Sequence, residues 1–431
     1  MSEATIESLL ARRRRTLGHP TPLFYDEPLH IVRGEGVWMF DHAGRRYLDA
    51  YNNVPHVGHC HPHVVEALHR QAATLNVHTR YLHENVVRYG ERLTATYDPL
   101  LSTVLFVCTG TEANELALRI ARHHTRARGL LVTDWNYHGN STSLASVAKG
   151  VQTNEPFPAH ARTLRLPDVV RDLAQGGTPE QLISRALAEA DAAIASLQRE
   201  GYGVAALLLD TICGSEGLTR LPPGYVEQLV AKVRAAGGLF IADEVQPGLG
   251  RTGEHFWGYQ WFDVVPDIAT MGKPMGNGHP IGAAVTRPEL AGEFLSDAMF
   301  FNTFAGNPVS AAVGQAVLDV IEQEQLVRNA AETGAYLQQQ LSALAERHER
   351  VVAVRGKGLF LGLELVNDRC SRTPATAEAR ALINDMRRRG ALISTTGHHS
   401  NILKMRPPMV FSREHADLLL TTLDEALRAL K

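Results

Sequence analysis

The sequence predicts an α/β protein built on a mostly parallel sheet with helices on both faces. Short apolar runs end in polar or glycine-bearing loops, and amphipathic stretches with helical periodicity lie between them. In such sheets, ligands bind beyond the carboxyl ends of the strands. Gly110, Asp210 and Asp243 fall at these ends, so we expect the functional site there.

The elements follow in order along the chain. Residues 36–41 and 44–49 are patterned like the two strands of a hairpin. Five apolar runs are expected to be buried strands: Val104–Val107, Leu130–Val132, Ala205–Leu209, Leu239–Ala242 and Ile281–Val285. Three amphipathic stretches are expected to be helices: Glu112–His123, Gln181–Gln198 and Gly224–Ala236.

The last third of the chain is predicted to be mostly helical. One long helical stretch is expected from about Asn307 to about Arg350, followed by the apolar segment Val351–Leu365. Further helices are expected near Ala375–Arg389 and from Ser412. We interpret the two chain ends as one smaller α+β domain. Residues 1–50 and 311–431 would form it, and residues 51–310 would form the large domain.

Composition excludes several classes of function. The chain has 431 residues and a net charge of -3, which favours neither a nucleic-acid nor a membrane partner. No apolar run approaches the roughly 18 residues of a membrane span. Four scattered cysteines without C-x-x-C spacing indicate a reduced, cytoplasmic protein. The basic run Arg12–Arg15 is interpreted as a solvated helix face rather than a targeting signal.

Asp243 and Lys273 carry the most specific chemical signal. Asp243 ends a buried apolar run, and thirty positions later Lys273 stands among Gly272, Gly276 and Gly278. Alone, such an acid is often a helix cap and such a lysine is usually solvated. Together they suit pyridoxal phosphate (PLP), whose ring nitrogen needs an acid and whose aldehyde needs an amine. PLP is therefore the predicted cofactor.

Two further segments fit the same cofactor. Gly110 and Thr111 join a buried strand to a helix, where backbone N–H groups favour a phosphate. Tyr137 follows another strand and offers a ring that stacks on a flat cofactor. The alternatives are an ordinary helix cap and a buried tyrosine with its hydroxyl satisfied.

Three patterns are set aside. The run 248–253 fits G-x-G-x-x-G, but aromatic residues follow it instead of a clear helix. The segment around Lys273 lacks the upstream glycine and the Ser/Thr of a P-loop. Residues 59–63 hold three histidines, but Pro62 breaks the spacing and we expect no metal site there.

Taken together, the motifs resemble those of the class III aminotransferases, PLP enzymes of fold type I. The matching segments are 110–113, 137–139, 243–246, 250–253, Lys273 and 303–308. The resemblance implies a mostly parallel seven-stranded sheet. It also implies that Lys273 forms the Schiff base and that Asp243 pairs with the ring nitrogen.

The same resemblance implies the remaining cofactor contacts. Tyr137 would stack on one face of the ring and Val245 would support the other. Gln246 would approach the ring hydroxyl, and Gly110 with Thr111 would bind the phosphate. Thr303 would reach in from a second subunit, so a homodimer is implied.

Within that class, residues 52–62, 272–280 and 301–310 are most similar to the ethanolamine-phosphate phospho-lyases. The glutamate motif of ordinary transaminases is replaced by 210–215, and Lys404 stands in place of their carboxylate-binding arginine. The resemblance implies β-elimination of phosphate from a phosphorylated amine. Lys404, Arg80 and Arg406 are the candidate phosphate-binding residues, each alternatively a surface charge. A transaminase acting on an ω-amine or alanine, or a binding protein without activity, stays open.

Overall fold

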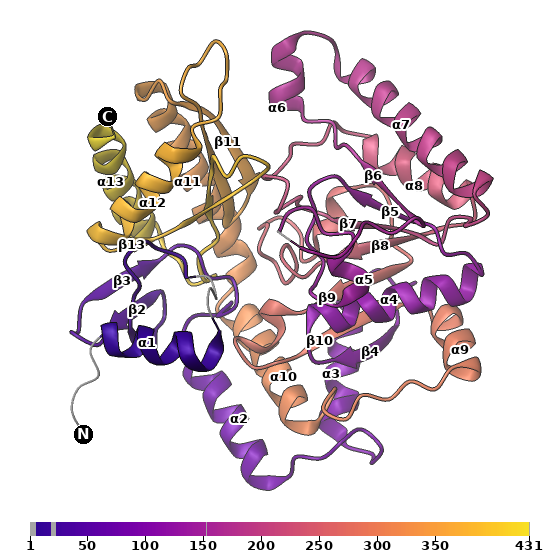
Figure 1. Cartoon of the computed structure of the whole chain (residues 1–431). Coiled ribbons are helices and arrows are strands. Elements are labelled where there is room, and N and C mark those ends of the chain that lie inside the picture. The colour runs from indigo at the N-terminus through magenta and orange to yellow at the C-terminus, as the bar shows by residue number, and fades with distance from the viewer. Residues whose placement is uncertain (1–5, 19–22, 152, 431) are drawn as a thin grey trace.

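The computed structural model describes residues 6–18, 23–151 and 153–430. Its centre is a seven-stranded sheet in the order β4-β10-β9-β8-β7-β5-β6 (Figure 1). The strands are β4 (Thr103–Val107), β5 (Leu130–Thr133), β6 (Ala161–Leu164), β7 (Ala206–Asp210), β8 (Leu239–Asp243), β9 (Ile268–Met271) and β10 (Gly282–Thr286). The middle strands are buried throughout, as expected for a sheet covered on both faces.

Helices cover this sheet and connect its strands. They are α2 (Pro62–Thr74), α3 (Glu84–Thr94), α4 (Gly110–Thr125), α5 (Thr142–Ala145), α6 (Val169–Asp172), α7 (Pro179–Arg199), α8 (Tyr225–Ala235), α9 (Pro288–Asp297) and α10 (Pro308–Gln323). Three short 3₁₀ turns are η1 (Leu173–Gln175), η2 (Gly258–Trp261) and η3 (Lys273–Gly276). Helix α4 packs against the strands β8, β9 and β10, and its buried face is made of small and aliphatic side chains.

The direction of the strands brings the polar loops together. Strands β5 to β9 run parallel, whereas β10 is antiparallel to both β9 and β4. Because β10 is antiparallel to both of its neighbours, β4 and β9 run in the same direction. The loops after β4, β5, β7, β8 and β9 therefore leave one edge of the sheet, which is where the predicted cofactor-binding residues other than Thr303 lie.

The two chain ends meet outside this sheet. Strands β1 (Ile31–Glu35), β2 (Trp38–Asp41) and β3 (Arg46–Asp49) form a sheet whose fourth strand is β13 (Ala391–Leu392), parallel to β3. Another sheet joins β11 (Val351–Lys357), β12 (Phe360–Leu365), β15 (Ile402–Met405) and β14 (Ser394–Thr396). Helices α11 (Leu326–Arg347), α12 (Thr376–Arg389) and α13 (Arg413–Ala429) complete this part, beside the N-terminal strands in Figure 1. The domain boundaries after residues 50 and 310 stay predictions.

The structure corrects three details of the sequence prediction. The single helix expected from about Asn307 to Arg350 is two helices, because Gln325 adopts a left-handed conformation (φ 51°) between α10 and α11. Strands β6 (Ala-Arg-Thr-Leu) and β9 (Ile-Ala-Thr-Met) were missed, since polar residues interrupt both and leave no continuous apolar run of three residues. Strand β10 was expected, but its antiparallel direction was not.

The N-terminal segment forms helix α1 (Ile6–Leu17), which buries none of its residues. Its basic run therefore lies on a solvated face, as predicted. Among the described residues, every helix is too short or too polar to cross a membrane.

Candidate active site

A cavity lies at the edge of the sheet where these strands end. It is lined by Gly110, Thr111, Tyr137, His138, Gly139, Asp210, Asp243, Val245, Gln246 and Lys273. The list contains every residue predicted to bind the cofactor except Thr303. Residues that are far apart in the sequence meet there because five strand ends converge on it.

Asp243 is the most heavily bonded acid in this cavity. One oxygen, Oδ2, accepts from His138 Nδ1 at 2.7 Å and from Asn114 Nδ2 at 2.9 Å. The other, Oδ1, accepts from the backbone N–H of Val245 at 3.0 Å. Asn114 is itself fixed by Thr270, whose hydroxyl donates to its Oδ1 at 2.6 Å. These bonds hold the carboxylate in one orientation at the cavity wall.

These contacts also set the charge of Asp243. Burial is the largest single cause and raises the pKa of its carboxyl, but the hydrogen bond and the charge of His138, together with the bonds from Val245 and Asn114, lower that pKa overall. For His138, burial lowers the pKa, and the hydrogen bond and charge of Asp243 raise it overall. Asp243 is therefore ionised at neutral pH. A buried anion of this kind is suited to stabilising a cationic ring nitrogen.

Lys273 follows β9 as the first residue of η3. Burial is the main cause that lowers the pKa of its amine, and the charge of Arg406 lowers it further. A lowered pKa leaves a larger fraction of the amine unprotonated at neutral pH. An unprotonated amine is the form that attacks an aldehyde.

Gly110 and Thr111 form the first turn of α4, as predicted. Thr109 caps the helix by accepting from the backbone N–H of Glu112 at 3.1 Å. The first N–H groups of a helix have no partner within it, and they favour an anion. A Cβ on Gly110 would lie 2.9 Å from Val245 Cγ2, so a larger residue would narrow the cavity.

Gly272 shows how tightly two of these loops pack. A Cβ there would lie 2.9 Å from the backbone nitrogen of Gly110. The start of α4 and the lysine-bearing loop are thus in direct contact. This closeness places a candidate phosphate site beside the loop that carries Lys273.

The donor set in this cavity fits PLP. It combines an amine of lowered pKa, a buried ionised carboxylate and a helix N-terminus, which match the aldehyde, the ring nitrogen and the phosphate of that cofactor. Tyr137 and Val245 add an aromatic and an aliphatic surface to the cavity. Tyr137 is 39% exposed, so the alternative of a buried tyrosine with a satisfied hydroxyl is wrong.

Lys404 and Arg406 lie beside this cavity and are buried. Lys404 projects from β15 and donates to the carbonyl oxygen of Gly214 at 3.1 Å. Arg406 donates to the carbonyl oxygen of Tyr51 at 3.1 Å and to Gln246 Oε1. The alternative interpretation of these two as surface charges is therefore wrong.

The position of Gly214 relates Lys404 to the cavity. A Cβ built on Gly214 would lie 3.2 Å from both Asp210 Oδ2 and Gln246 Nε2, two atoms of cavity-lining side chains. Both cations also face the ring of Phe360, at 5.5 Å for Lys404 and 5.9 Å for Arg406. Lys404 and Arg406 thus flank the same wall, next to Gln246.

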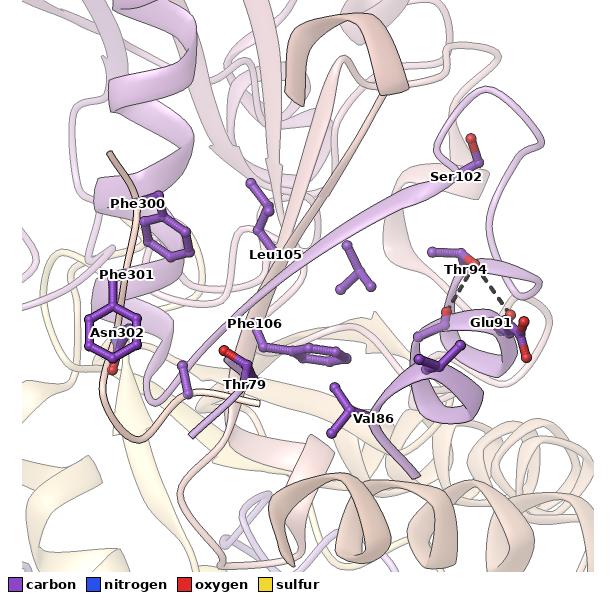
Figure 2. A pocket seen from close by; sticks show the side chains of 14 residues that line it. Thr79, Val86, Glu91, Thr94, Ser102, Leu105, Phe106, Phe300, Phe301 and Asn302 are labelled. Atoms are coloured by element: carbon purple, nitrogen blue, oxygen red, sulfur yellow. Dashed lines mark hydrogen bonds between the residues drawn. The ribbon is translucent and has the colours of Figure 1, made fainter. Parts of the chain in front are cut away.

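Arg80 and Thr303 are not brought to the cavity within one chain. Arg80 is exposed, and its guanidinium lies 4.0 Å from the ring centroid of Phe301. Thr303 is exposed in the segment that leads into α10. Both adjoin a second, mostly apolar cavity of about 430 Å³ between α3, β4 and residues 300–305 (Figure 2).

Three residues of the site were missed by sequence reasoning. His138 stands in the Tyr-His-Gly motif, but only its tyrosine was given a role. Asn114 stands four positions into α4 and bonds to both Asp243 and the carbonyl oxygen of His138. Glu216 is buried beyond Asp210, and Thr133 donates to it. The helical position of Asn114, on the buried face of α4, was the available signal for it.

The fold and this cavity together define a PLP-dependent enzyme of fold type I. The chain belongs to the class III aminotransferase family, whose pattern matches residues 24–427. A protein of Drosophila melanogaster named alanine–glyoxylate aminotransferase 2-like is 41% identical over 97% of this chain and 86% of its own length. Ethanolamine-phosphate phospho-lyase homolog 1 of Caenorhabditis elegans is 36% identical over 98% and 93%.

A solved structure is also similar. It is a phospholyase from Arthrobacter in complex with phosphoethanolamine, 53% identical in sequence, with a TM-score of 0.96. The match covers 98% of this chain and all of that one. The family and its dependence on PLP are therefore shown, whereas the relatives' names divide between lyase and transaminase.

Proposed function

We propose that this protein is a PLP-dependent lyase that eliminates phosphate from phosphoethanolamine or a closely related phosphorylated amine. The products would be an aldehyde (acetaldehyde from phosphoethanolamine), ammonia and phosphate. The observation that carries the proposal is the pair of buried cationic side chains, Lys404 and Arg406, beside the cavity. The likeness to a phospholyase in complex with phosphoethanolamine supports it.

The argument from the cations is electrostatic. Within the described part of the chain, neither Lys404 nor Arg406 forms an ion pair with a carboxylate; their nearest acceptors are two carbonyl oxygens and an amide. The charges of Asp210 and Glu216 favour the charged form of Lys404 only in part, since the pKa of its amine stays well below the ordinary value. A buried cation without a paired counter-charge is costly. A phosphate dianion would supply that counter-charge to both side chains at once, and arginine grips phosphate in two-point fashion.

The roles of the other residues follow from their places. When bound, PLP withdraws electrons from the carbon next to the substrate nitrogen, which makes its C–H bond acidic. Asp243 holds a negative charge at the wall of the cavity for the ring nitrogen. Gly110 and Thr111 offer the helix N-terminus to the cofactor phosphate. Lys273 removes the proton from the carbon next to nitrogen, for which its lowered pKa suits it.

We propose that the enzyme works as a homodimer in which Thr303 completes the partner's site. Support comes from exposed apolar side chains around this segment: Met299 is 80% exposed, Phe304 73% and Leu82 100%. Each is close in sequence to residues that line the apolar cavity of Figure 2, among them Thr79 and Phe301. Arg80 contacts Phe301 on this surface, so it would reach the substrate only across the interface.

The test of the lyase is direct. The purified holoenzyme is incubated with phosphoethanolamine, and inorganic phosphate and acetaldehyde are measured. Equal amounts of the two products, formed without a keto acid, are expected. Ethanolamine is the control substrate, because it lacks the leaving phosphate. Absence of phosphate release would refute the proposal.

Transamination is the second candidate, because several relatives carry the names of alanine–glyoxylate aminotransferases. It would use the same Lys273 and Asp243. An amine that converts the cofactor to its pyridoxamine form, with dependence on pyruvate or ketoglutarate, would favour it.

We propose a cytoplasmic location, since all four cysteines are unpaired thiols.

A further inference from the structure

We propose that Lys404, besides binding the substrate phosphate, is the general acid that protonates it as it leaves. This inference rests on the lyase function proposed above and adds a catalytic role to a residue placed there for binding only. It stands on the hydrogen bond of the Lys404 amine to Gly214, which packs against Asp210 and Gln246 of the cavity wall.

The chemistry requires such an acid. A phosphate monoester dianion that leaves without a proton departs as the trianion, a strongly basic and therefore poor leaving group. In the proposed step, Lys273 takes the proton from the carbon that bears nitrogen. The electron pair of that C–H bond becomes the second bond to the neighbouring carbon. The C–O bond breaks, its electron pair goes to the phosphate oxygen, and Lys404 gives that oxygen a proton.

The surroundings of Lys404 suit proton donation. Burial lowers the pKa of its amine well below the ordinary value, and the charges of Arg406 and Lys273 lower it further, against the opposite effect of Asp210 and Glu216. A lower pKa makes the ammonium a stronger acid. A bound phosphate dianion favours the charged form, so the amine would carry its proton when the substrate is in place.

Arg406 cannot take this role, although it bonds directly to Gln246 of the cavity wall. A guanidinium does not release its proton at any pH relevant to proteins. Arg406 would therefore only stabilise the negative charge of the phosphate, whereas Lys404 would stabilise that charge and also donate a proton.

The experiment measures two steps in the same reaction. The holoenzyme is given phosphoethanolamine in D₂O, and deuterium entering recovered substrate at the carbon next to nitrogen is compared with phosphate released. Deuterium reports the step of Lys273, and phosphate reports the step of Lys404. Their ratio does not depend on how tightly the substrate binds. Lys404→Arg keeps the charge without a transferable proton, and Lys404→Met removes both.

We expect the ratio of phosphate release to deuterium exchange to fall about 100-fold or more in both variants. The matched control Lys232→Arg, on α8 and paired with Asp191, should keep the wild-type ratio. With 2-fluoroethylamine, whose fluoride leaves without a proton, elimination by Lys404→Arg should stay within about threefold of wild type. Binding of inorganic phosphate, measured by calorimetry, should weaken in Lys404→Met.

The outcomes separate this inference from the function on which it rests. A wild-type enzyme that releases no phosphate refutes the lyase itself. A wild-type enzyme that releases phosphate, with variants whose release and exchange fall together, leaves the lyase standing and overturns the acid role. Unchanged phosphate affinity in Lys404→Met would also overturn it, because Lys404 would then not touch the phosphate.

Discussion

His138 Nδ1 lies 2.7 Å from Asp243 Oδ2, so a histidine that follows β5 bonds to an acid that ends β8. This hydrogen bond joins the loop after β5 to the end of β8 at one carboxylate oxygen. Asn114 Nδ2, from α4, reaches the same oxygen at 2.9 Å. The carboxylate proposed to serve the cofactor is thus oriented by residues of two other elements.

Replacing Asp243 tests the electrostatic role of that carboxylate. In Asp243→Asn the side chain keeps its size but loses its charge, so the ring nitrogen has no anionic partner. Turnover should fall about 100-fold or more, with the circular dichroism spectrum unchanged. Turnover near the wild-type rate would show that Asp243 does not serve the ring.

Lys273 is expected to hold the cofactor covalently. Borohydride reduction of the holoenzyme, followed by tryptic digestion and mass spectrometry, should place the cofactor on the peptide that begins at Thr252. Lys273→Ala should abolish turnover, and the same treatment should leave the protein untagged. A tag on a different lysine would contradict the assignment.

Glu216 is expected to make the free energy of unfolding depend on pH. Burial, followed by the charge of Asp210, raises the pKa of its carboxyl from 4.5 to about 8. The folded state therefore binds a proton that the unfolded state releases above its own pKa. The stability that this proton contributes is complete below about pH 4.5 and is lost as the pH rises through about 8, at up to about 1.4 kcal/mol per pH unit.

Denaturant melts of wild type and Glu216→Gln between these pH values measure this effect. The uncharged variant should lose less stability as the pH rises. The exposed substitution Glu289→Gln, on α9, should leave the wild-type slope intact. Parallel slopes for wild type and Glu216→Gln would contradict the raised pKa.

Mixed dimers test the position of Thr303. Thr303→Glu would place a negative charge against the cofactor phosphate of the partner, and Lys273→Ala removes the amine of its own chain. Each variant alone should be inactive. After unfolding and refolding together, heterodimers would carry one intact site, restoring about a quarter of the wild-type activity.

No restoration, with dimers confirmed by light scattering, would show that Thr303 serves its own chain or none. A monomer at micromolar concentration would refute the dimer itself. Thr79→Glu, at the edge of the cavity in Figure 2, separates loss of the interface from loss of the site, because it should weaken association without entering the partner's site.

The sequence predicted the parts of this fold that local patterns encode. Strands β4, β5, β7, β8 and β10 were recognisable as apolar runs before polar loops. The antiparallel direction of β10 was not predictable in this way, because a buried strand has the same composition whichever way it runs. The break at Gln325 was hidden, since glutamine is a good helix former and gives no sign of a left-handed turn.

The residues of the candidate site were likewise predictable only where a local sequence pattern marks them. Lys273 and Asp243 were found because each stands in a distinctive local setting. Asn114 was missed because its importance comes from its bond to Asp243, 129 positions away. The burial of Arg406 was also hidden, since a charged residue just after a strand and before two prolines gives no local sign that it is buried.

Strand β3 pairs with β13, and the Arg406 backbone N–H donates to the carbonyl oxygen of Ala50 at 2.9 Å. These contacts join the two ends of the chain, which has a consequence for how the enzyme's substrate specificity evolves. A fragment from β4 to α10 would hold every proposed cofactor ligand and neither buried cation. The proposed cofactor contacts and the proposed phosphate-binding and proton-donating residues thus lie on different stretches of chain. Changes in the C-terminal segment would alter substrate choice and protonation of the leaving group while the cofactor contacts stay the same.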